Sequence, residues 1–233
     1  MPPDDRRTYY DHEPAYRDLA AQGGRGWEDR SPDAGHDPYA GLEILFGFPL
    51  LPAAGARVLD LGCGGGQVSL ALAARGFEVL GLDFSPSAIA LARANATAAG
   101  QSVRFEVADC LDPRCVVPGT FDLVVDHHVL HCIVGDPDRQ GFLGLVHRAL
   151  RPGGLFFSET MSAEGELDHA HYRIDPETRV SLAGNRVMIL RDELHGELGR
   201  AGLQVVHHET RIDPDDPPSG EMLLTFALRV AAS

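Results

Sequence analysis

The stretch Val58-Leu59-Asp60-Leu61-Gly62-Cys63-Gly64-Gly65-Gly66 sets the fold of this chain. A short apolar run ends here in a glycine-rich segment, and a run rich in Leu and Ala follows from Gln67. Glycines at such a junction let the backbone turn tightly and approach a ligand closely, with the N–H groups of the next helix facing that ligand. The stretch therefore predicts a strand, a ligand-binding loop and a helix.

The spacing of the glycines argues against a nicotinamide dinucleotide as the ligand. The fingerprint for that ligand is G-x-G-x-x-G, and counted from Gly62 its last glycine would fall on Gln67. Asp60, just before the glycines, would repel a pyrophosphate. The loop instead suits a ligand that carries positive charge.

Apolar runs and helical patterns alternate along the rest of the chain. Strands are expected at residues 57–61, 77–82, 103–107, 121–125, 155–159, 203–208 and 222–230, and helices at 14–21, 39–48, 67–75, 86–99, 138–150 and 191–201. Ser85 followed by Pro86 is a typical helix start, and Pro152, Gly153 and Gly154 are expected to end a helix. Near-continuous apolar strands between helices predict an α/β fold with a doubly wound, mostly parallel seven-stranded sheet whose last two strands form a hairpin at one side.

Two segments stand outside this alternation. We expect residues 1–52 to form an N-terminal cap segment and residues 53–233 to form the ligand-binding domain. Residues 161–188 have no clear hydrophobic period, and we interpret them as an insert that forms a lid.

The composition narrows the range of partners. The 233 residues include 34 acidic and 20 basic ones, every basic one is Arg, and the net charge is −14. The lack of Lys excludes Schiff-base chemistry and the P-loop lysine. A strongly acidic chain with scattered Arg is not expected to bind nucleic acid or membranes. The N-terminus lacks the apolar core of a signal peptide and the four cysteines form no CxxC pair, so a cytoplasmic protein with reduced thiols is expected.

Four successive predicted strands end in an aspartate. These residues are Asp60, Asp83, Asp109 and Asp126. In a doubly wound sheet the carboxyl ends of the strands form the ligand crevice. Four acids at that place favour a ligand with hydroxyls, an exocyclic amine and positive charge.

With these motifs the chain resembles the class I S-adenosylmethionine-dependent methyltransferases. The segments VLDLGCGGG, GLDFSPSAIALARA, VADCLD, FDLVVDHHVLHCI and ALRPGGLFF follow one another at that family's distances between residues 56 and 160. The resemblance implies S-adenosylmethionine as cofactor and transfer of its methyl group to a small-molecule acceptor, at nitrogen or oxygen. The transfer is an in-line displacement that requires positioning and no metal.

The resemblance also implies roles for single residues on the methionine and ribose side. Gly62, Gly64 and Gly66, with Cys63 between them, would pass beneath the cofactor. Asp60 would orient the methionine end, and Asp83 would accept hydrogen bonds from the ribose hydroxyls.

Four further positions would complete the cofactor site. Phe84 would lie against the adenine, Asp109 would accept a hydrogen bond from the adenine amine, and the Cys110 N–H would donate to the ring. The backbone carbonyl of Asp126 would meet the methionine amine.

Histidines gather where the acceptor should lie, and histidine is the base best suited to neutral pH. We expect His128, and after it His171, as the general base, and we expect substrate contacts from Trp27, His127, His131 and Tyr172. Packing is an open alternative for His131 and for the segment around Trp27. His127 and His131 would face one metal ion if their segment were helical.

Three other functions stay open at this point. The same cofactor pocket serves aminopropyl transfer, and it also serves non-catalytic proteins that bind S-adenosylmethionine. A nicotinamide-dependent oxidoreductase is disfavoured by Gln67 and by the absence of Lys. The sequence does not specify the acceptor or the oligomeric state.

Overall fold

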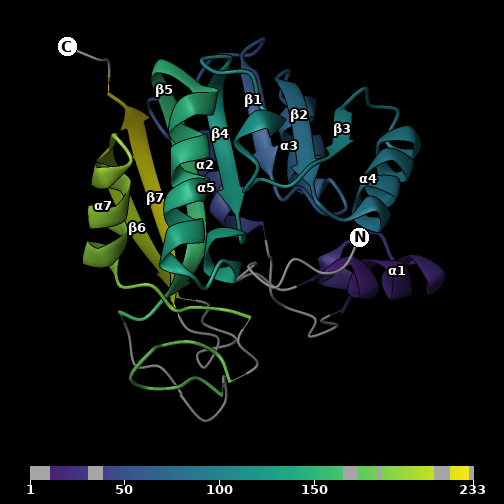
Figure 1. Cartoon of the computed structure of the whole chain (residues 1–233). Coiled ribbons are helices and arrows are strands. Elements are labelled where there is room, and N and C mark those ends of the chain that lie inside the picture. The colour runs from purple at the N-terminus through teal and green to yellow at the C-terminus, as the bar shows by residue number, and fades with distance from the viewer. Residues whose placement is uncertain (1–10, 31–38, 165–172, 183–184, 213–220, 231–233) are drawn as a thin grey trace.

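The central feature of the molecule is a seven-stranded sheet with the strand order β3-β2-β1-β4-β5-β7-β6 (Figure 1). The computed structural model describes residues 11–30, 39–164, 173–182, 185–212 and 221–230. The strands are β1 (Arg57–Leu61), β2 (Glu78–Asp83), β3 (Arg104–Val107), β4 (Phe121–His127), β5 (Leu150–Ser162), β6 (Leu203–Ile212) and β7 (Glu221–Arg229). The first five pair in parallel, while β7 is antiparallel to both β5 and β6. The predicted doubly wound sheet with a hairpin at one side is confirmed.

Helices cover both faces of this sheet. They are α1 (Glu13–Ala21), α2 (Ala40–Gly47), α3 (Gln67–Ala74), α4 (Pro86–Ala98), α5 (Asp136–Ala149) and α7 (Arg191–Arg200), with short 3-10 turns η1 (Trp27–Arg30), η2 (Pro113–Cys115) and η3 (Leu130–Cys132). None of the helices in the described ranges is long and apolar enough to cross a membrane.

Alternating side chains of the strands build two core layers. In β4, Leu123 and Val125 pack with α2 and α3, whereas Val124 packs on the opposite face with α5 and α7. All three are fully buried. A strand that is apolar at successive positions therefore needs cover on both sides, which explains the continuous apolar runs of the central strands.

The start of α4 has the serine cap and the first-turn proline expected from its sequence. The Ser85 hydroxyl accepts a hydrogen bond from the Ala88 N–H at 3.0 Å, and Pro86 occupies the first turn. The glycine loop likewise requires glycine, because Gly66 has a φ of 86° and a Cβ there would lie 2.8 Å from the Phe105 ring.

The prediction for residues 150–162 was wrong in its boundaries. Helix α5 ends at Ala149 and β5 begins directly at Leu150, so Pro152, Gly153 and Gly154 lie within the strand. The pairing with β4 is irregular there, since Phe121 pairs with Leu150 and Leu123 with Leu155. This irregularity in the pairing takes up the residues that were expected to end the helix. Strand β5 also extends to Ser162, which places the beginning of the expected lid insert inside the sheet.

The N-terminal segment is not separate from the sheet core. Leu42 and Leu45 of α2 are buried against β1, β4 and β5, and α1 packs against α4. The domain boundary at residue 52 stays a prediction.

A buried ion pair joins α5 to α7. Arg139 Nη2 lies 2.8 Å from Glu197 Oε1, and both side chains are at least nine-tenths buried. Arg139 also donates to the Val134 carbonyl, so its guanidinium ties the start of α5 to α7.

We predict that Arg139→Ala lowers the free energy of unfolding by about 3–5 kcal/mol, because it leaves the Glu197 charge buried without its partner. The matched control is Arg114→Ala, whose pair with Asp112 has the same 2.8 Å distance but is exposed. That control should have little effect on the free energy of unfolding, because solvent screens an exposed pair. Urea denaturation measures both, and equal losses would contradict the assignment.

Candidate cofactor and acceptor site

Three buried carboxylates meet at the carboxyl edge of the sheet. The parallel register places Leu61 beside both Leu82 and Asp126, so the ends of β1, β2 and β4 are neighbours. The exposed fractions are 1% for Asp60, 7% for Asp83 and 0% for Asp126. Removing three acids from water is costly unless charge or hydrogen bonds compensate them, so this edge of the sheet suits a positively charged ligand.

Asp83 connects the glycine loop to β2. Its carboxylate accepts hydrogen bonds from the Gly64 N–H at 3.0 Å and from the Ser85 N–H at 2.8 Å. Burial raises the pKa of Asp83, and these two N–H groups oppose that rise. Each carboxylate oxygen accepts one bond in this way and keeps a further lone pair.

Asp60 lies beneath the loop and has the most strongly perturbed titration of the three. Its only hydrogen-bond donor among the described residues is the Ser69 hydroxyl, at 2.5 Å. Burial raises the pKa of Asp60 to about 7, and repulsion from Asp83 and Asp126 contributes, although the Ser69 bond and His127 act in the opposite direction.

Asp126 uses its side chain to fold the loop after β4. The carboxylate accepts from the Val129 N–H at 2.8 Å, the Leu130 N–H at 3.2 Å and the Ser158 hydroxyl at 2.6 Å. Burial raises its pKa to about 6 against the effect of these bonds. The side chain thus has a structural role, while the expected contact of its backbone carbonyl with the cofactor stays a prediction.

The residues expected around the adenine lie at the ends of β2 and β3. Phe84 and Cys110 are half-buried, and burial raises the pKa of the Cys110 thiol well above its ordinary value. Asp109 accepts a hydrogen bond from the Leu111 N–H at 2.9 Å. Their contacts with a cofactor stay predictions.

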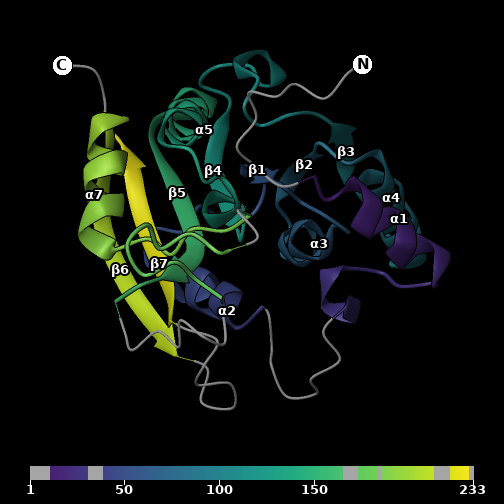
Figure 2. The same ribbon diagram turned by 60° about the horizontal axis from the view of Figure 1, so that its bottom comes forward.

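The N-terminal segment covers the glycine loop. Figure 2 shows α1 next to α4, and Glu13 of α1 accepts hydrogen bonds from the hydroxyls of Ser85 and Ser87, each at 2.7 Å. A Cβ on Gly64 would lie 2.3 Å from the Tyr16 hydroxyl. Trp27 packs against the Tyr16 ring with centroids 5.6 Å apart. Glu13 was not anticipated from the sequence, because its partners are more than 70 positions away.

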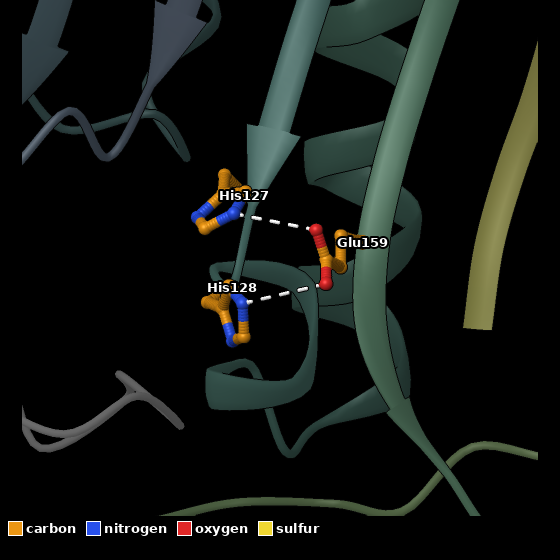
Figure 3. Close-up of side chains that lie close together, drawn as sticks. All are labelled: His127, His128 and Glu159. Carbon is orange, nitrogen blue, oxygen red and sulfur yellow. Dashed lines mark ion pairs between the residues drawn. The ribbon is translucent and has the colours of Figure 1, made fainter. Parts of the chain in front are cut away.

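The other wall of the site is a cluster of His127, His128 and Glu159, shown in Figure 3. Strand β4 ends at His127, which pairs in register with Glu159 of β5. His127 Nε2 lies 3.3 Å from Glu159 Oε2, and His128 Nε2 lies 4.0 Å from Glu159 Oε1. Arg211 Nη2 reaches the same Oε1 at 3.0 Å.

The charges in this cluster are set by burial and by its members. Burial alone would raise the pKa of Glu159, but His127, His128 and Arg211 lower it to about 2. Burial lowers the pKa of His128 to about 3, with repulsion from His127, while Glu159 opposes the shift. Near neutral pH the cluster therefore holds an ionised carboxylate beside an uncharged His128 imidazole.

Glu159 is the main site residue missed in the sequence. An acid inside an apolar strand was the available signal, since a fully buried carboxylate requires partners or a function. Gly41 of α2 is part of the same arrangement, because a Cβ there would lie 1.9 Å from Glu159 Oε2.

The remaining histidine predictions have different outcomes. His131 is buried behind His128, where its Nδ1 accepts from the Met161 N–H at 3.4 Å, which supports the packing alternative. The structure places His127 next to His128 and Glu159. Among the described residues, His131 does not belong to the group of possible metal ligands that contains His127, so the suggested pairing of His127 with His131 on one metal ion is not formed. His171 and Tyr172 lie outside the described residues.

A hollow of about 190 Å³ lies beyond the end of β5, lined in part by Met161, Arg173 and Arg186. Arg186 acts electrostatically on both His128 and His131. Arg179 is engaged elsewhere, because its guanidinium binds Glu193 and the Met188 carbonyl.

Comparison with known proteins identifies the family. Residues 52–202 match the methyltransferase domain family, and the chain belongs to it. With its sheet topology and glycine loop, the chain is a member of the class I S-adenosylmethionine-dependent methyltransferases, for which S-adenosylmethionine is the cofactor. The resemblance found in the sequence is confirmed.

A curated relative is a ubiquinone biosynthesis O-methyltransferase of Thiobacillus denitrificans, 36% identical over 111 residues, which are 48% of this chain and 47% of that protein. The chain thus matches about half the length of this relative.

Solved structures share the fold. The 1,6-didemethyltoxoflavin-N1-methyltransferase of Burkholderia thailandensis, with 1,6-didemethyltoxoflavin and S-adenosylhomocysteine bound, has a TM-score of 0.63 and 21% identity, covering 99% of both chains. A protein solved in work on the conversion of a disulfide bond into a thioacetal group during echinomycin biosynthesis has a TM-score of 0.67 and 28% identity, covering 95% of this chain and 92% of that one.

We predict that Asp60→Asn increases the free energy of unfolding of the ligand-free protein more at pH 8 than at pH 4. The folded-state pKa of about 7 lies above the model-compound value of 3.8, so the native protein loses stability as the pH rises between them. The Asp60→Asn variant has no such loss. Its free energy of unfolding relative to the unaltered protein should therefore increase by about 2–4 kcal/mol across this range. Denaturation at both pH values measures it.

The matched control for this change is Asp112→Asn. Asp112 is exposed, and its contacts with Arg114 lower its pKa, so the sign of its pH dependence is the opposite. A pH-independent effect of Asp60→Asn would show that its carboxyl is not perturbed by burial.

Proposed function

We propose that this protein transfers the methyl group of S-adenosylmethionine to an oxygen or nitrogen atom of a small-molecule acceptor. The observation that carries the proposal is the burial of Asp60, Asp83 and Asp126 beside the glycine loop. A cofactor with a sulfonium and an ammonium group supplies the positive charge that these acids lack. The names of the relatives, an O-methyltransferase and an N1-methyltransferase, support both kinds of acceptor atom.

The cofactor is proposed to lie across the loop with its ribose at Asp83 and its methionine end toward Asp60. The free lone pairs of Asp83 would accept from the two ribose hydroxyls. Gly62 and Gly64 both have positive φ values, of 66° and 52°. Without side chains they let Val129 and Tyr16 approach the backbone of the loop closely.

The acceptor is proposed to enter from the side of the histidine cluster. The hollow lined by Met161, Arg173 and Arg186 suits an acceptor with an apolar body and an anionic or polar group, and Arg186 also acts electrostatically on His128. On the opposite side Tyr16 and Trp27 would exclude water from the methyl group.

The reaction is a displacement at the methyl carbon. A lone pair of the acceptor forms the new bond to carbon, the carbon–sulfur bond breaks, and neutral S-adenosylhomocysteine leaves. The acceptor's proton would pass to the uncharged His128 imidazole, and Glu159 would stabilise the imidazolium as it forms. The pKa of His128 is about 3 in the ligand-free protein even with Glu159 beside it, so the proposed role requires that the bound cofactor and acceptor raise this pKa.

We predict that S-adenosylhomocysteine raises the melting temperature whereas a nicotinamide dinucleotide does not.

Asp83→Ala should weaken S-adenosylhomocysteine binding by about 1–3 kcal/mol, because the ribose hydroxyls lose a charged acceptor. Calorimetry measures the affinity, with the exposed Asp112→Ala as control. Unchanged affinity in Asp83→Ala would remove this residue from the site, and stabilisation by the dinucleotide alone would overturn the proposed function.

We also predict that replacing His128 lowers turnover by roughly 10²–10⁴ and leaves cofactor affinity unchanged. Asn is the preferred replacement, because His128 has a φ of 71° and Asn tolerates this region of backbone space. The assay uses an acceptor selected from a panel of phenols, catechols and amines. His147→Asn, on α5, is the control. Normal turnover of His128→Asn from pH 6 to pH 9 would make His128 a structural residue.

A further inference from the structure

We propose that His127, His128 and Glu159 form a binding site for a divalent transition-metal ion. One potential ligand atom from each of the three residues lies within 4.8 Å of the other two. The side chain of Glu159 is fully buried and that of His127 is 10% exposed. Among the described residues, His128 Nε2 has no hydrogen-bond partner, and His127 Nε2 and Glu159 Oε2 face each other at 3.3 Å without hydrogen-bond geometry. Buried polar atoms are rarely left without full partners, and the convergence of these three suits a bound cation.

The three side chains are held in place by the backbone. Register fixes His127 against Glu159, and the N–H of His128 donates to the Glu159 carbonyl at 3.0 Å. The left-handed conformation of His128 turns its ring back toward the carboxylate, as Figure 3 shows. Tyr39 stacks on the His127 ring with centroids 5.8 Å apart. A site whose ligands are positioned before the ion arrives requires little ordering on binding.

Arg211 binds one of the two carboxylate oxygens of Glu159 and not the other. Its guanidinium occupies Oε1 at 3.0 Å, and this leaves Oε2 to the side of His127. The positive charge of Arg211 weakens the attraction for a cation, but its hydrogen bond also orients the ligating carboxylate, as outer-shell partners of metal sites do.

Two imidazoles and one carboxylate are a ligand set typical of zinc, iron and cobalt. Such a set leaves at least one coordination position open. Within the proposed function, that position would hold an acceptor hydroxyl, whose proton would pass to water as the ion lowers its pKa, so that His128 would serve as a metal ligand in place of the general base. Binding of an acceptor at the metal ion rests on the proposed function. The acceptors it implies are hydroxylated compounds that coordinate through oxygen. It departs from the expectation that transfer needs no metal.

The site is tested by titrating Co²⁺ into the tag-free full-length chain after removal of metals with a chelator. We expect a visible d–d absorption band that saturates at one ion per chain. Glu159→Gln should weaken Co²⁺ binding at least about 10-fold, as loss of a ligand does. No band, or equal binding by Glu159→Gln and the unaltered chain, would overturn the proposal.

A second pair of variants leaves all three ligands intact. Gly41→Ala should also weaken binding, because its Cβ would meet Glu159 Oε2, whereas Gly47→Ala in the same helix meets nothing within 4 Å. Melting curves of each variant confirm that it is folded. Unchanged Co²⁺ affinity in folded Gly41→Ala would contradict the site.

The same samples separate this proposal from the proposed function. Co²⁺ binding without any effect of S-adenosylhomocysteine on the melting temperature would support the metal site and contradict methyl transfer. The opposite result would contradict the metal site and leave the proposed function in place.

Discussion

The structure depends on the burial of three carboxylates at one edge of a parallel sheet. Asp60, Asp83 and Asp126 end up side by side because β1, β2 and β4 are neighbours in the sheet and all end there. Burial raises the pKa of each of them, and their mutual repulsion adds to the effect at Asp60. A free energy cost of this kind persists in a folded protein where function requires it. Here it prepares the edge for a cationic cofactor.

Two of these acids, and Glu13 of α1, also organise neighbouring parts of the site. Asp83 ties the glycine loop to β2, and Asp126 folds the loop that carries the histidines. Glu13 links α1 to the start of α4 by accepting a hydrogen bond from the Ser87 N–H. The cofactor loop, the acceptor wall and the cover are thus held by carboxylates that bind backbone N–H or hydroxyl groups. A change at the edge is expected to affect all three parts together.

The sheet was predictable from the sequence because its signals are local. The run from Val58 to Gly66, the Ser85 cap and the apolar strands all act within a few residues, and the structure confirms them. The start of β5 was predicted wrongly, because the irregular pairing opposite Phe121 is specified by a partner strand and not by Pro152 and its glycines.

The acceptor side was less predictable for the same reason. Glu159 joins the histidines only through the β4–β5 register, and Gly41 joins it from a helix more than 100 residues away in the sequence. Hydrophobic period and turn chemistry carry no information on such contacts. His128 was anticipated from its residue type, but the burial that lowers its pKa is a property of the folded site.

The central claim is that the buried acids at the sheet edge receive a cation. It is tested most directly by counting the protons released when S-adenosylhomocysteine binds, using calorimetry at pH 6.5 in buffers with different ionisation enthalpies. Because the pKa of Asp60 is about 7 in the free protein, the account predicts that a cationic amino group displaces a large part of one proton, and that Asp60→Asn abolishes this release. Binding without proton release, or with the same release in Asp60→Asn, would contradict the account.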